Sequence, residues 1–371
     1  MASRIVPTNL ARLAIRTARP SVQTFAAPAG ARAFSAGKTY GLKATGVKQE
    51  TIREKEVPVS VYAPNSKGNT APSSDHFTIP VKATGAPTGT PTPPVEDESV
   101  TPLSQEQYDA LPKTMKSMSL MGKVVIVTGG ARGLGNSMAR ACAEAGARAI
   151  ILFDANQELG DQAAEELHNK TSLPVTFFKV DVRDGAAINA AVDAVVEKFG
   201  APDVLVNSAG IADSNIKAET YDPAMFRRLI DINLNGSFLM SQSVGRAMMA
   251  AGKPGSIVLV ASMSGTVVNY PQEQCCYNAS KAGVVQLGKS LAAEWAKHNI
   301  RVNCISPGYM DTALNRVPAL DAQKKIWKSL TPQARLGAVD DLNGLCVFLA
   351  SDSSSFMTGS NVLIDGGYTC Y

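Results

Sequence analysis

Residues 124–135 read VVIVTGGARGLG, an apolar, β-branched run that passes directly into a glycine-rich turn. Such a run is typical of a strand that is buried on both faces of a sheet. Beyond the turn, apolar residues recur at i, i+3, i+4 and i+7 from Met138 to Ala145, and Gly146 is placed to end the helix that this period predicts. The stretch therefore predicts a strand, a tight turn and a helix in succession.

The same alternation of short apolar runs and longer helical patterns continues to the C-terminus. It predicts seven strands, at Val124–Val127, Ala149–Phe153, Val175–Val180, Val204–Val206, Ile257–Val260, Val302–Ile305 and Val362–Ile364. Strand, helix, strand units in series give a parallel sheet with helices on both faces. The predicted fold class is therefore α/β: a Rossmann-type, doubly wound, seven-stranded parallel sheet in a single domain over residues 120–371.

The chain before residue 120 has a different composition. Residues 64–102 are dense in Pro, Thr, Ser and Gly, so we predict a disordered linker over residues 35–103. Ser104 and Gln107 have the spacing of a capping box, which predicts one short helix between the linker and the domain.

The first residues have the composition of a mitochondrial transit peptide. Residues 1–49 contain five arginines, three lysines and no acid, with apolar residues on one face of a possible helix. Residues 32–35, Arg-Ala-Phe-Ser, resemble a matrix-protease site with cleavage after Phe34. We therefore predict a transit peptide at residues 1–34 and location in the mitochondrial matrix; a merely disordered basic tail is the alternative. A secretory signal is disfavoured because no continuous apolar segment follows the first arginine.

Composition and charge exclude several classes of protein. The leader contributes +8 to a net charge of +4, so the remaining chain is mildly acidic and we predict no nucleic-acid partner. No stretch approaches the ~18 uninterrupted apolar residues of a membrane span, so we predict no membrane insertion. The six cysteines show no C-x-x-C spacing and the chain has three histidines, so we predict reduced thiols and no metal site.

The glycine-rich turn predicts a dinucleotide site. Glycines let the backbone approach a pyrophosphate, and the helix N-terminus stabilises its charge, although a tight strand-to-helix turn uses glycine anyway. Asp154 ends the second strand nineteen residues beyond Gly135, where a carboxylate accepts hydrogen bonds from a ribose and repels a 2′-phosphate. We therefore predict NAD as the preferred cofactor. NADP is the alternative, because Arg132 could reach a 2′-phosphate or simply pair with Asp154. The other interpretation of Asp154 is a cap of the next helix, shared with Asn156.

The spacing T-G-x-x-x-G-x-G at residues 128–135 resembles the short-chain dehydrogenase/reductase family, and the resemblance extends over residues 120–371. Residues 207–210, Asn-Ser-Ala-Gly, are similar to the family's N-N-A-G element, with Ser208 departing from the second Asn. The resemblance implies cofactor contacts at Thr128, Gly129, Arg132, Gly133, Leu134, Gly135, Asp154, Asp181, Val182, Asn207, Ala209, Gly210, Tyr277, Lys281, Pro307, Gly308 and Thr312.

Tyr277 and Lys281 form a Y-x-x-x-K signature and are the predicted centre of the chemistry. Residues four apart on a helix share a face, so the ammonium lies near the phenol and is expected to lower the phenol pKa. Tyr277 would then take a proton from an alcohol as hydride leaves, while Lys281 holds the nicotinamide ribose. Taken alone, the pair would be an ordinary amphipathic one. The resemblance also implies a structural and catalytic role for Asn233.

The catalytic serine, which donates a hydrogen bond to the substrate oxygen, has two candidates. Counting thirteen residues back from Tyr277, the common family spacing, gives Ser264. Aligning from the end of the strand gives Ser262 and implies a two-residue insertion in the following loop. We prefer Ser262 because a strand fixes position better than a loop does, and we expect the other serine to cap a backbone amide.

Residues 269–276, NYPQEQCC, precede Tyr277 and predict a polar wall suited to a polyhydroxylated ligand, unless they face solvent or a neighbouring subunit. With residues 263–265 and the ending DGGYTC at 365–370, they resemble fungal polyol dehydrogenases and ketose reductases, particularly those acting on D-arabinitol. That resemblance implies oxidation of D-arabinitol to D-ribulose. An NADPH-dependent carbonyl or ketose reductase of xylulose or sorbose type is the alternative. A non-catalytic dinucleotide sensor is disfavoured because the set Asn233, Ser262, Tyr277 and Lys281 is complete.

Two further expectations concern a lid and the oligomer. Residues 309–336 are predicted to form a mobile lid over the substrate. Members of the family are commonly tetramers in which the helix that carries the Tyr lies at an interface, so a homotetramer is expected. The apolar residues that permit such an interface, although packing on the sheet needs the same pattern, are Val284, Val285, Leu287, Leu291 and Trp295.

Overall fold

The computed structural model of the chain describes residues 100–213, 215–312, 315 and 320–371. Contacts divide the chain into two units, Met1–Thr84 and Gly85–Tyr371, and every described residue belongs to the second. The predicted transit peptide and the predicted linker up to residue 99 lie outside the described residues.

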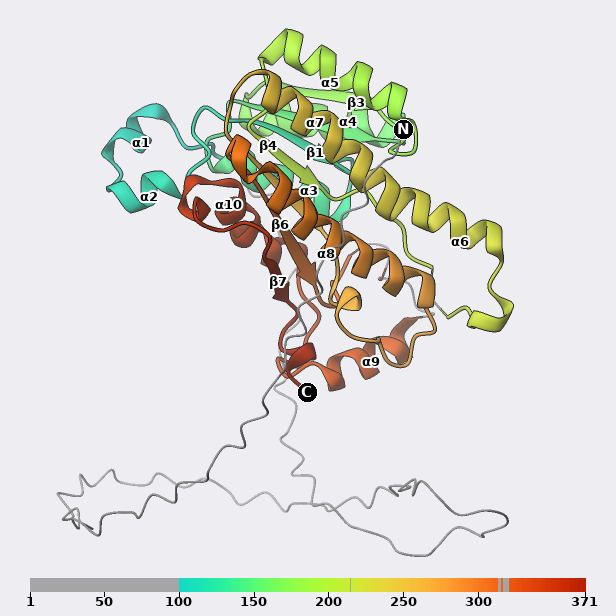
Figure 1. Ribbon diagram of the computed structural model, residues 1–371. Helices are drawn as coiled ribbons and strands as arrows, with labels where there is room; N and C mark the ends of the chain where they lie inside the picture. Colours follow the sequence, from blue (N-terminus) through green and yellow to red (C-terminus); the bar gives the residue numbers. More distant parts are fainter. Residues whose placement is uncertain (1–99, 214, 313–314, 316–319) are drawn as a thin grey trace, which may run out of the picture. The chain divides into compact units, whose positions relative to one another are not determined.

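Within the described residues, seven strands form one parallel sheet in the order β3-β2-β1-β4-β5-β6-β7 (Figure 1). All seven predicted runs are strands, because burial on both faces leaves a continuous apolar run in the sequence. The predicted fold class is confirmed. The strands are β1 (Val124–Thr128), β2 (Ala149–Asp154), β3 (Val175–Lys179), β4 (Val204–Asn207), β5 (Gly255–Val260), β6 (Ile300–Pro307) and β7 (Asn361–Ile364).

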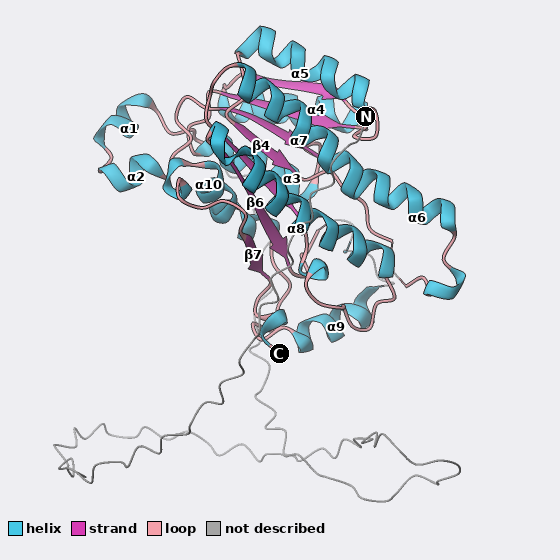
Figure 2. Cartoon of the chain, viewed as in Figure 1, coloured by secondary structure: helices cyan, strands magenta, loops and turns pink. Residues whose placement is uncertain are grey.

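Helices cover both faces of the sheet (Figure 2). Helices α3 (Gly133–Glu144), α4 (Gln157–Thr171) and α10 (Asn343–Ala350) pack on one face, and α5 (Gly185–Phe199), α7 (Gly236–Ala250) and α8 (Cys275–Trp295) pack on the other. Alternate residues of β1 point into the two cores: Ile126 faces α5 and α7, and Val127 faces α3. Each such fully buried side chain stabilises the fold by roughly 1.5–3 kcal/mol.

The remaining helical segments connect these layers. Ser104 and Gln107 form the predicted capping box at the start of α1 (Gln105–Ala110), each accepting from the other's backbone N–H. A second short helix, α2 (Lys113–Ser117), follows and is tied to the domain by a hydrogen bond of 2.8 Å between the Ser117 and Ser353 hydroxyls. The other elements are α6 (Pro223–Ile230), a π-turn at Asp231–Asn235, α9 (Asp321–Leu330), and 3₁₀ turns at Ala218–Thr220, Met263–Gly265, Ala296–His298, Val339–Leu342, Asp352–Ser354 and Tyr368–Cys370.

The apolar face of α8 packs against the sheet. Val284 and Leu291 are buried, and Val285, Leu287 and Trp295 pack against the same core. Sheet packing thus accounts for the pattern that also permitted a subunit interface, and the tetramer stays a prediction. In the part of the chain that the structure describes, no helix combines the length and the apolar character needed to span a bilayer.

Candidate active site

The predicted site residues lie at the carboxyl ends of the central strands. Thr128 ends β1, Asn207 ends β4 and Pro307 ends β6, while Ser262 follows β5 by two residues. The sheet order reverses between β1 and β4, the point at which open α/β sheets form a ligand crevice. The parallel topology therefore brings together residues that are more than one hundred positions apart in sequence.

Two glycines of the turn after β1 are required by the chain's own packing. A Cβ on Gly135 would lie 2.3 Å from the Gly129 carbonyl oxygen, and one on Gly129 would lie 3.0 Å from Ala209 Cα. Gly129 and Gly133 both have φ of +63°, the left-handed region that favours glycine. Around Gly133, by contrast, nothing lies within 4 Å of a Cβ position. Backbone atoms of the protein therefore pack tightly against Gly129 and Gly135, whereas the space around Gly133 is free for a ligand.

The start of α3 fits an anionic group. The N-cap residue, Arg132, supplies no side-chain acceptor, so the first N–H groups of the helix are left for a ligand. Gly133, at the first position of the helix, adjoins the open space described above. A pyrophosphate suits this combination of free donors, positive helix end and space, and the residues present fit a dinucleotide.

Asp154 lies against the glycine turn. Its Oδ2 accepts a hydrogen bond from Ala131 N at 3.3 Å and its Oδ1 accepts one from Asn156 N at 3.1 Å. The cap of α4 is Asn156, which accepts from Leu159 N at 3.0 Å, so the interpretation of Asp154 as a helix cap is wrong. Arg132 is exposed and makes no ion pair with Asp154 among the described residues. Lys179 of β3 stands opposite Asp154 in the sheet register.

Thr128 and Asn207 hold two strand ends together. The Thr128 hydroxyl donates to Asn207 Oδ1 at 2.9 Å and accepts from the N–H groups of Ser208 and Ala209, each at 3.0 Å. Asn207 Nδ2 donates to the Ser237 carbonyl at 3.0 Å. These polar atoms are used within the protein, so both side chains shape the crevice by fixing the backbone that lines it.

Asp181 is paired with Arg183, whose Nη2 lies 2.6 Å from Asp181 Oδ2, and this guanidinium holds the carboxyl pKa below its usual value. The next residue, Val182, is buried against α7: a Cβ on Gly236 would lie 2.7 Å from Val182 Cγ2. The backbone of Asp181 and Val182, two of the predicted cofactor contacts, is thereby held against the start of α7.

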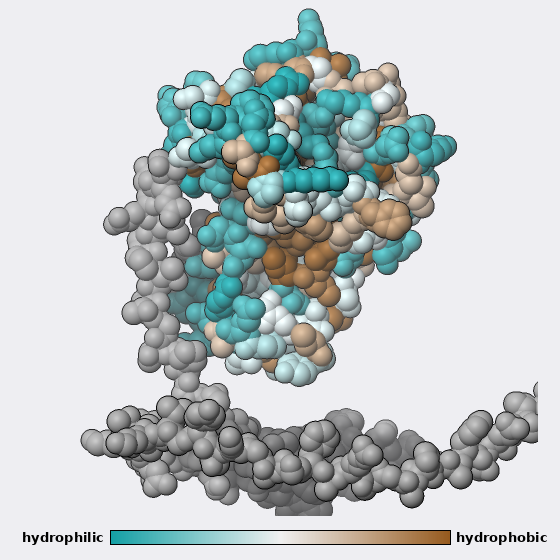
Figure 3. Space-filling view, turned by 90° about the vertical axis from the view of Figure 1, so that its left-hand side faces the viewer, coloured by the Kyte–Doolittle hydropathy of each residue, from teal (hydrophilic) through white to brown (hydrophobic). Residues whose placement is uncertain are grey.

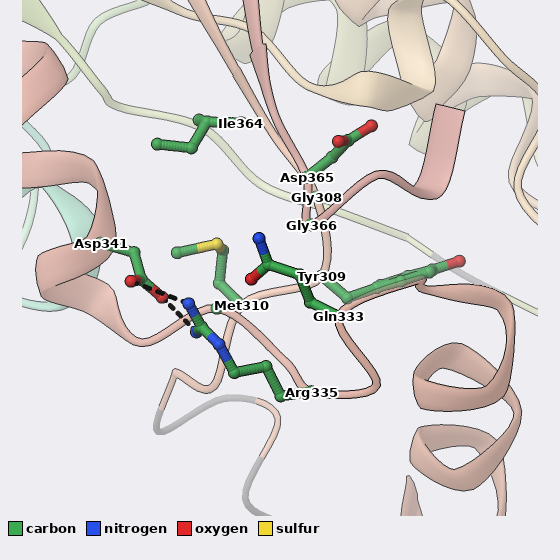
Figure 4. A pocket seen from close by; sticks show the side chains of 10 residues that line it. Gly308, Tyr309, Met310, Gln333, Arg335, Asp341, Ile364, Asp365 and Gly366 are labelled. Atoms are coloured by element: carbon green, nitrogen blue, oxygen red, sulfur yellow. Dashed lines mark hydrogen bonds and ion pairs between the residues drawn. The ribbon is translucent and has the colours of Figure 1, made fainter. Parts of the chain in front are cut away.

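The segment after β6 also depends on a close approach. Gly308 N donates to the Ile364 carbonyl at 3.0 Å, and a Cβ on Gly308 would lie 2.7 Å from Asp365 Cα. Beside it is a cavity of about 210 Å³, where Arg335 reaches toward Asp341 in a double hydrogen bond (Figure 4). Thr312 follows, its N–H donating to the Met310 carbonyl at 3.0 Å. Six residues of the predicted lid, 313–314 and 316–319, lie outside the described residues.

Tyr277 and Lys281 lie on the first two turns of α8, and the lysine Nζ is 5.7 Å from the centre of the tyrosine ring. Nζ donates to the Val260 carbonyl at 2.9 Å, and burial lowers the Lys281 pKa to about 8. Burial raises the pKa of Tyr277, while a hydrogen bond with Ser262 opposes this rise. We predicted a lowered pKa for Tyr277, and its direction is wrong: desolvation by burial is the largest cause and raises the pKa.

Both candidate serines are buried, and Ser262 is the one whose side chain acts on the pKa of Tyr277. The choice of Ser262 as the catalytic serine stays a prediction. Its Oγ accepts from Ser264 N at 3.1 Å and donates to Ser264 Oγ at 3.0 Å. The serine that caps a backbone amide is thus Ser262 itself, whereas we expected that role for the other serine. Gly265 lies against α8: a Cβ there would be 2.8 Å from the Lys281 carbonyl. The missing side chain lets the segment that follows the two serines pack close to the helix that carries Lys281.

Asn233 fixes the loop after β4. Its side chain accepts from Ile211 N and donates to Ile211 O, each at 2.9 Å, and also donates to Ser280 Oγ at 3.1 Å. It lies in the π-turn between α6 and α7, where a single wide turn re-aims a side chain. A Cβ on Gly210 would lie 3.2 Å from Asn233 Oδ1 and 3.6 Å from Lys281 Nζ, so these three residues converge.

The polar loop before Tyr277 turns inward. Gln274 Nε2 donates to Asn269 Oδ1 at 2.8 Å, and Asn269 Nδ2 donates to the Tyr309 hydroxyl at 3.2 Å. The Tyr309 hydroxyl in turn donates to Gln272 Oε1, and its ring stacks on Trp327 of α9 at 4.2 Å. Asn269 and Gln274 are buried, which disagrees with the alternative that these two face solvent. No sequence signal marks Tyr309 and Trp327 as partners of this loop.

The arrangement is suited to proton transfer at an alcohol or carbonyl. A half-buried phenol, a buried serine hydroxyl and a buried ammonium lie beside a turn that fits a dinucleotide. Among the described residues, no group of three or more His, Cys, Asp or Glu side chains is placed to hold a metal ion.

Comparison with known proteins agrees with this geometry. A family model described as enoyl-(acyl carrier protein) reductase matches residues 129–369. D-arabinitol 2-dehydrogenase [ribulose-forming] of Candida tropicalis is 40% identical over 284 residues, which are 72% of this chain and 100% of that protein. NADP-dependent mannitol dehydrogenase of Alternaria alternata is 42% identical over 253 residues, 67% of this chain and 93% of that protein.

A solved structure is also similar to this chain in both sequence and fold. The crystal structure of an NAD+-bound xylitol dehydrogenase is 33% identical, with a TM-score of 0.63, and covers 67% of this chain and 99% of its own. Both the sequence relatives and this structure match the part of the chain that carries the sheet and the crevice.

Proposed function

The chain belongs to the short-chain dehydrogenase/reductase family, and from that premise we propose that it interconverts a secondary alcohol of a sugar alcohol and the corresponding ketose, with D-arabinitol and D-ribulose as the leading pair. It is an NAD(P)-dependent dehydrogenase. The observation that carries the proposal is the placement of Lys281 beside the Tyr277 ring and of buried Ser262 after β5, next to a wall built from buried amide side chains. Buried amides are suited to hydroxyl-rich ligands because they offer both donors and acceptors.

The chain's own groups account for the proton chemistry. The nicotinamide dinucleotide, when bound, supplies the hydride acceptor. Ser262 donates a hydrogen bond to the substrate oxygen, and Tyr277, as the phenolate, takes the proton from it and becomes the phenol. Lys281 places a positive charge near the ring and stabilises that phenolate before the proton is transferred. In the reverse direction Tyr277 returns the proton to the ketose oxygen.

We propose NAD as the preferred cofactor. The residues that would hold it are the glycine turn, Asp154 and Lys281, with the segment at Gly308. The support is the carboxylate of Asp154, which lies at the turn, makes no ion pair with Arg132 among the described residues and would repel a 2′-phosphate. NADP is the rival, because Arg132 is exposed within the turn and the mannitol dehydrogenase of Alternaria alternata is NADP-dependent.

Turnover on a panel of pentitols, hexitols and the matching ketoses, measured with each cofactor, tests the proposal. We expect NAD-linked oxidation, fastest with D-arabinitol. Activity with NADPH and ketoses alone would favour the carbonyl or ketose reductase. Dinucleotide binding without turnover of any alcohol or ketone would favour a sensor.

We also propose a transit peptide at residues 1–34, a linker at residues 35–103 and location in the mitochondrial matrix, on the basic, acid-free leader. The N-terminus of the protein recovered from fractionated mitochondria tests this, and an intact Met1 would contradict it.

We also propose a homotetramer. Its support is the edge strand β7, where Leu363 is 38% exposed, and the apolar area that Figure 3 shows between polar surroundings. Sedimentation of the purified protein tests it.

A further inference from the structure

Two buried side chains outside the predicted catalytic set contact the catalytic serine or its partner. Ser264 Oγ lies 3.0 Å from Ser262 Oγ, and Gln274 Nε2 lies 3.3 Å from Ser264 Oγ. Ser262, Ser264 and Gln274 are each less than a tenth exposed. Three polar groups, Ser262, Ser264 and Gln274, therefore form a hydrogen-bonded row that begins at the serine proposed to contact the substrate.

Gln274 is held in one orientation. Its Nε2 donates to Asn269 Oδ1 at 2.8 Å and to Asn278 Oδ1 at 2.9 Å, and Ser264 Oγ shares these two protons at the longer distance of 3.3 Å. Asn269 Nδ2 is itself committed to the Tyr309 hydroxyl, so the Asn269 carbonyl oxygen must face Gln274. The nitrogen of the Gln274 amide, not its oxygen, is thereby presented to Ser264.

The hydroxyl proton of Ser262 points along this row and away from the proposed substrate position. Ser262 donates its single hydroxyl proton to Ser264 Oγ, which also accepts from Gln274. A substrate oxygen that gains negative charge is a stronger acceptor than a serine hydroxyl, so the proton of Ser262 turns toward it. Ser264 then has a free lone pair and its own proton, and it is already bonded to Ser262 through its backbone N–H at 3.1 Å.

We propose that Ser264 and Gln274 are positioning residues that support Ser262 in the transition state through a reversed chain of hydrogen bonds. In the reversed chain, Gln274 donates to Ser264, Ser264 donates to Ser262, and Ser262 donates to the substrate oxygen. No proton is transferred along it; only the two serine hydroxyls rotate. Each bond polarises the next, so the donor at the substrate becomes stronger than an isolated serine would be.

The variants Ser264→Ala and Gln274→Leu test the chain. The assay uses the best substrate from the alcohol and ketone panel, so it does not depend on which sugar alcohol that is. We expect kcat to fall about tenfold in each, with the substrate KM and the dinucleotide Kd changed less than about threefold, because the support acts only in the transition state. The double variant should lose no more than the larger single loss, since Gln274 acts through Ser264.

Conservative and remote substitutions separate this role from packing. Ser264→Thr keeps the hydroxyl and should retain kcat within about threefold of the parent. Ser290→Ala and Gln286→Leu, at exposed positions of α8, should leave kcat unchanged. With substrate deuterated at the reacting carbon, the isotope effect on kcat should be at least as large as in the parent. Parental kcat in Ser264→Ala, equal losses in Ser264→Ala and Ser264→Thr, or additive losses in the double variant would each overturn the proposal.

Discussion

The turn after β1 and the loop after β5 follow neighbouring parts of the same parallel sheet, yet they are built by different means. The turn at residues 128–135 is shaped by backbone contacts, such as the close approach of Gly135 to Gly129 O, and leaves open space at Gly133. The loop at residues 262–276 is shaped by side-chain hydrogen bonds, such as those of Gln274 to Asn269 and Asn278.

The difference teaches where each kind of specificity resides. A turn defined by missing side chains accepts any ligand that needs backbone donors and space, so it suits a shared cofactor. A loop defined by buried amides can be altered one polar atom at a time, so it suits discrimination among substrates. Four predictions test this division, in order of expected effect.

The largest effect is expected at Tyr277, the residue of α8 that directly follows the second region. Tyr277→Phe removes the proton acceptor and should lower kcat by roughly a thousandfold, within the range for a general acid or base. Because the turn after β1 is untouched, the dinucleotide Kd should stay within about threefold of the parent. Steady-state kinetics and cofactor titration measure both. Near-parental turnover with intact cofactor binding would exclude Tyr277 as the proton-transfer group.

A methyl group added to the first region should weaken cofactor binding. In Gly135→Ala the new Cβ meets the Gly129 carbonyl oxygen, so the turn must shift, at a cost of about 1–3 kcal/mol in stability and about a hundredfold in dinucleotide Kd. Gly344→Ala is the matched control, since nothing lies within 4 Å of a Cβ there. Titration calorimetry and urea unfolding measure the two quantities. Equal behaviour of the two variants would show that the turn is not sterically determined.

The boundary of the cofactor region is expected to tolerate a change of charge. Asp154→Ser removes the carboxylate that would repel a 2′-phosphate, so the ratio of kcat/KM for NAD to that for NADP should fall about thirtyfold. Asp161→Ser, a change of the same charge at an exposed position of α4, serves as control. A ratio that does not move in Asp154→Ser would transfer cofactor choice to Arg132.

The smallest effect concerns stability and pH. Burial lowers the Lys281 pKa to about 8, whereas the unfolded chain keeps a value near 10.5. Between pH 8 and 10 the unfolded state therefore binds more protons than the folded state, and the free energy of unfolding rises with pH. One proton over two pH units sets a ceiling of about 2.7 kcal/mol, and we expect about 1–2 kcal/mol. In urea unfolding of the cofactor-free protein, this rise should be missing in Lys281→Met.

The sheet could be predicted from the sequence because a strand that is buried on both faces consists of a continuous run of apolar residues. Ends of strands were harder, and β6 shows why. Its predicted run begins at Val302, yet the strand begins at Ile300, because Arg301 interrupts the apolar pattern. The guanidinium of Arg301 is accommodated by the carbonyls of Leu349 and Ser351, partners about fifty residues away. Because these partners of Arg301 are distant in sequence, the residues around Arg301 do not reveal that it belongs to the strand.

In the candidate site, spacing along one helix was predictable and burial was not. The i, i+4 relation placed Lys281 beside Tyr277, as the structure shows. The direction of the Tyr277 pKa was predicted wrongly because desolvation depends on how α8 packs, which the sequence does not express. The inward turn of Gln274 was missed for the same reason, since Ser264 and Asn269 reach it only in the folded loop.

The stack of Tyr309 on Trp327 has a kinetic consequence. Tyr309 is covalently adjacent to Gly308, one of the predicted cofactor contacts, and its ring lies within 8° of the plane of the Trp327 indole in α9. Because the Tyr309 ring is stacked on Trp327, we expect a cofactor bound at Gly308 to restrict the motion of α9 as well. We expect a compulsory order of addition, with dinucleotide before sugar alcohol, and product-inhibition patterns to match.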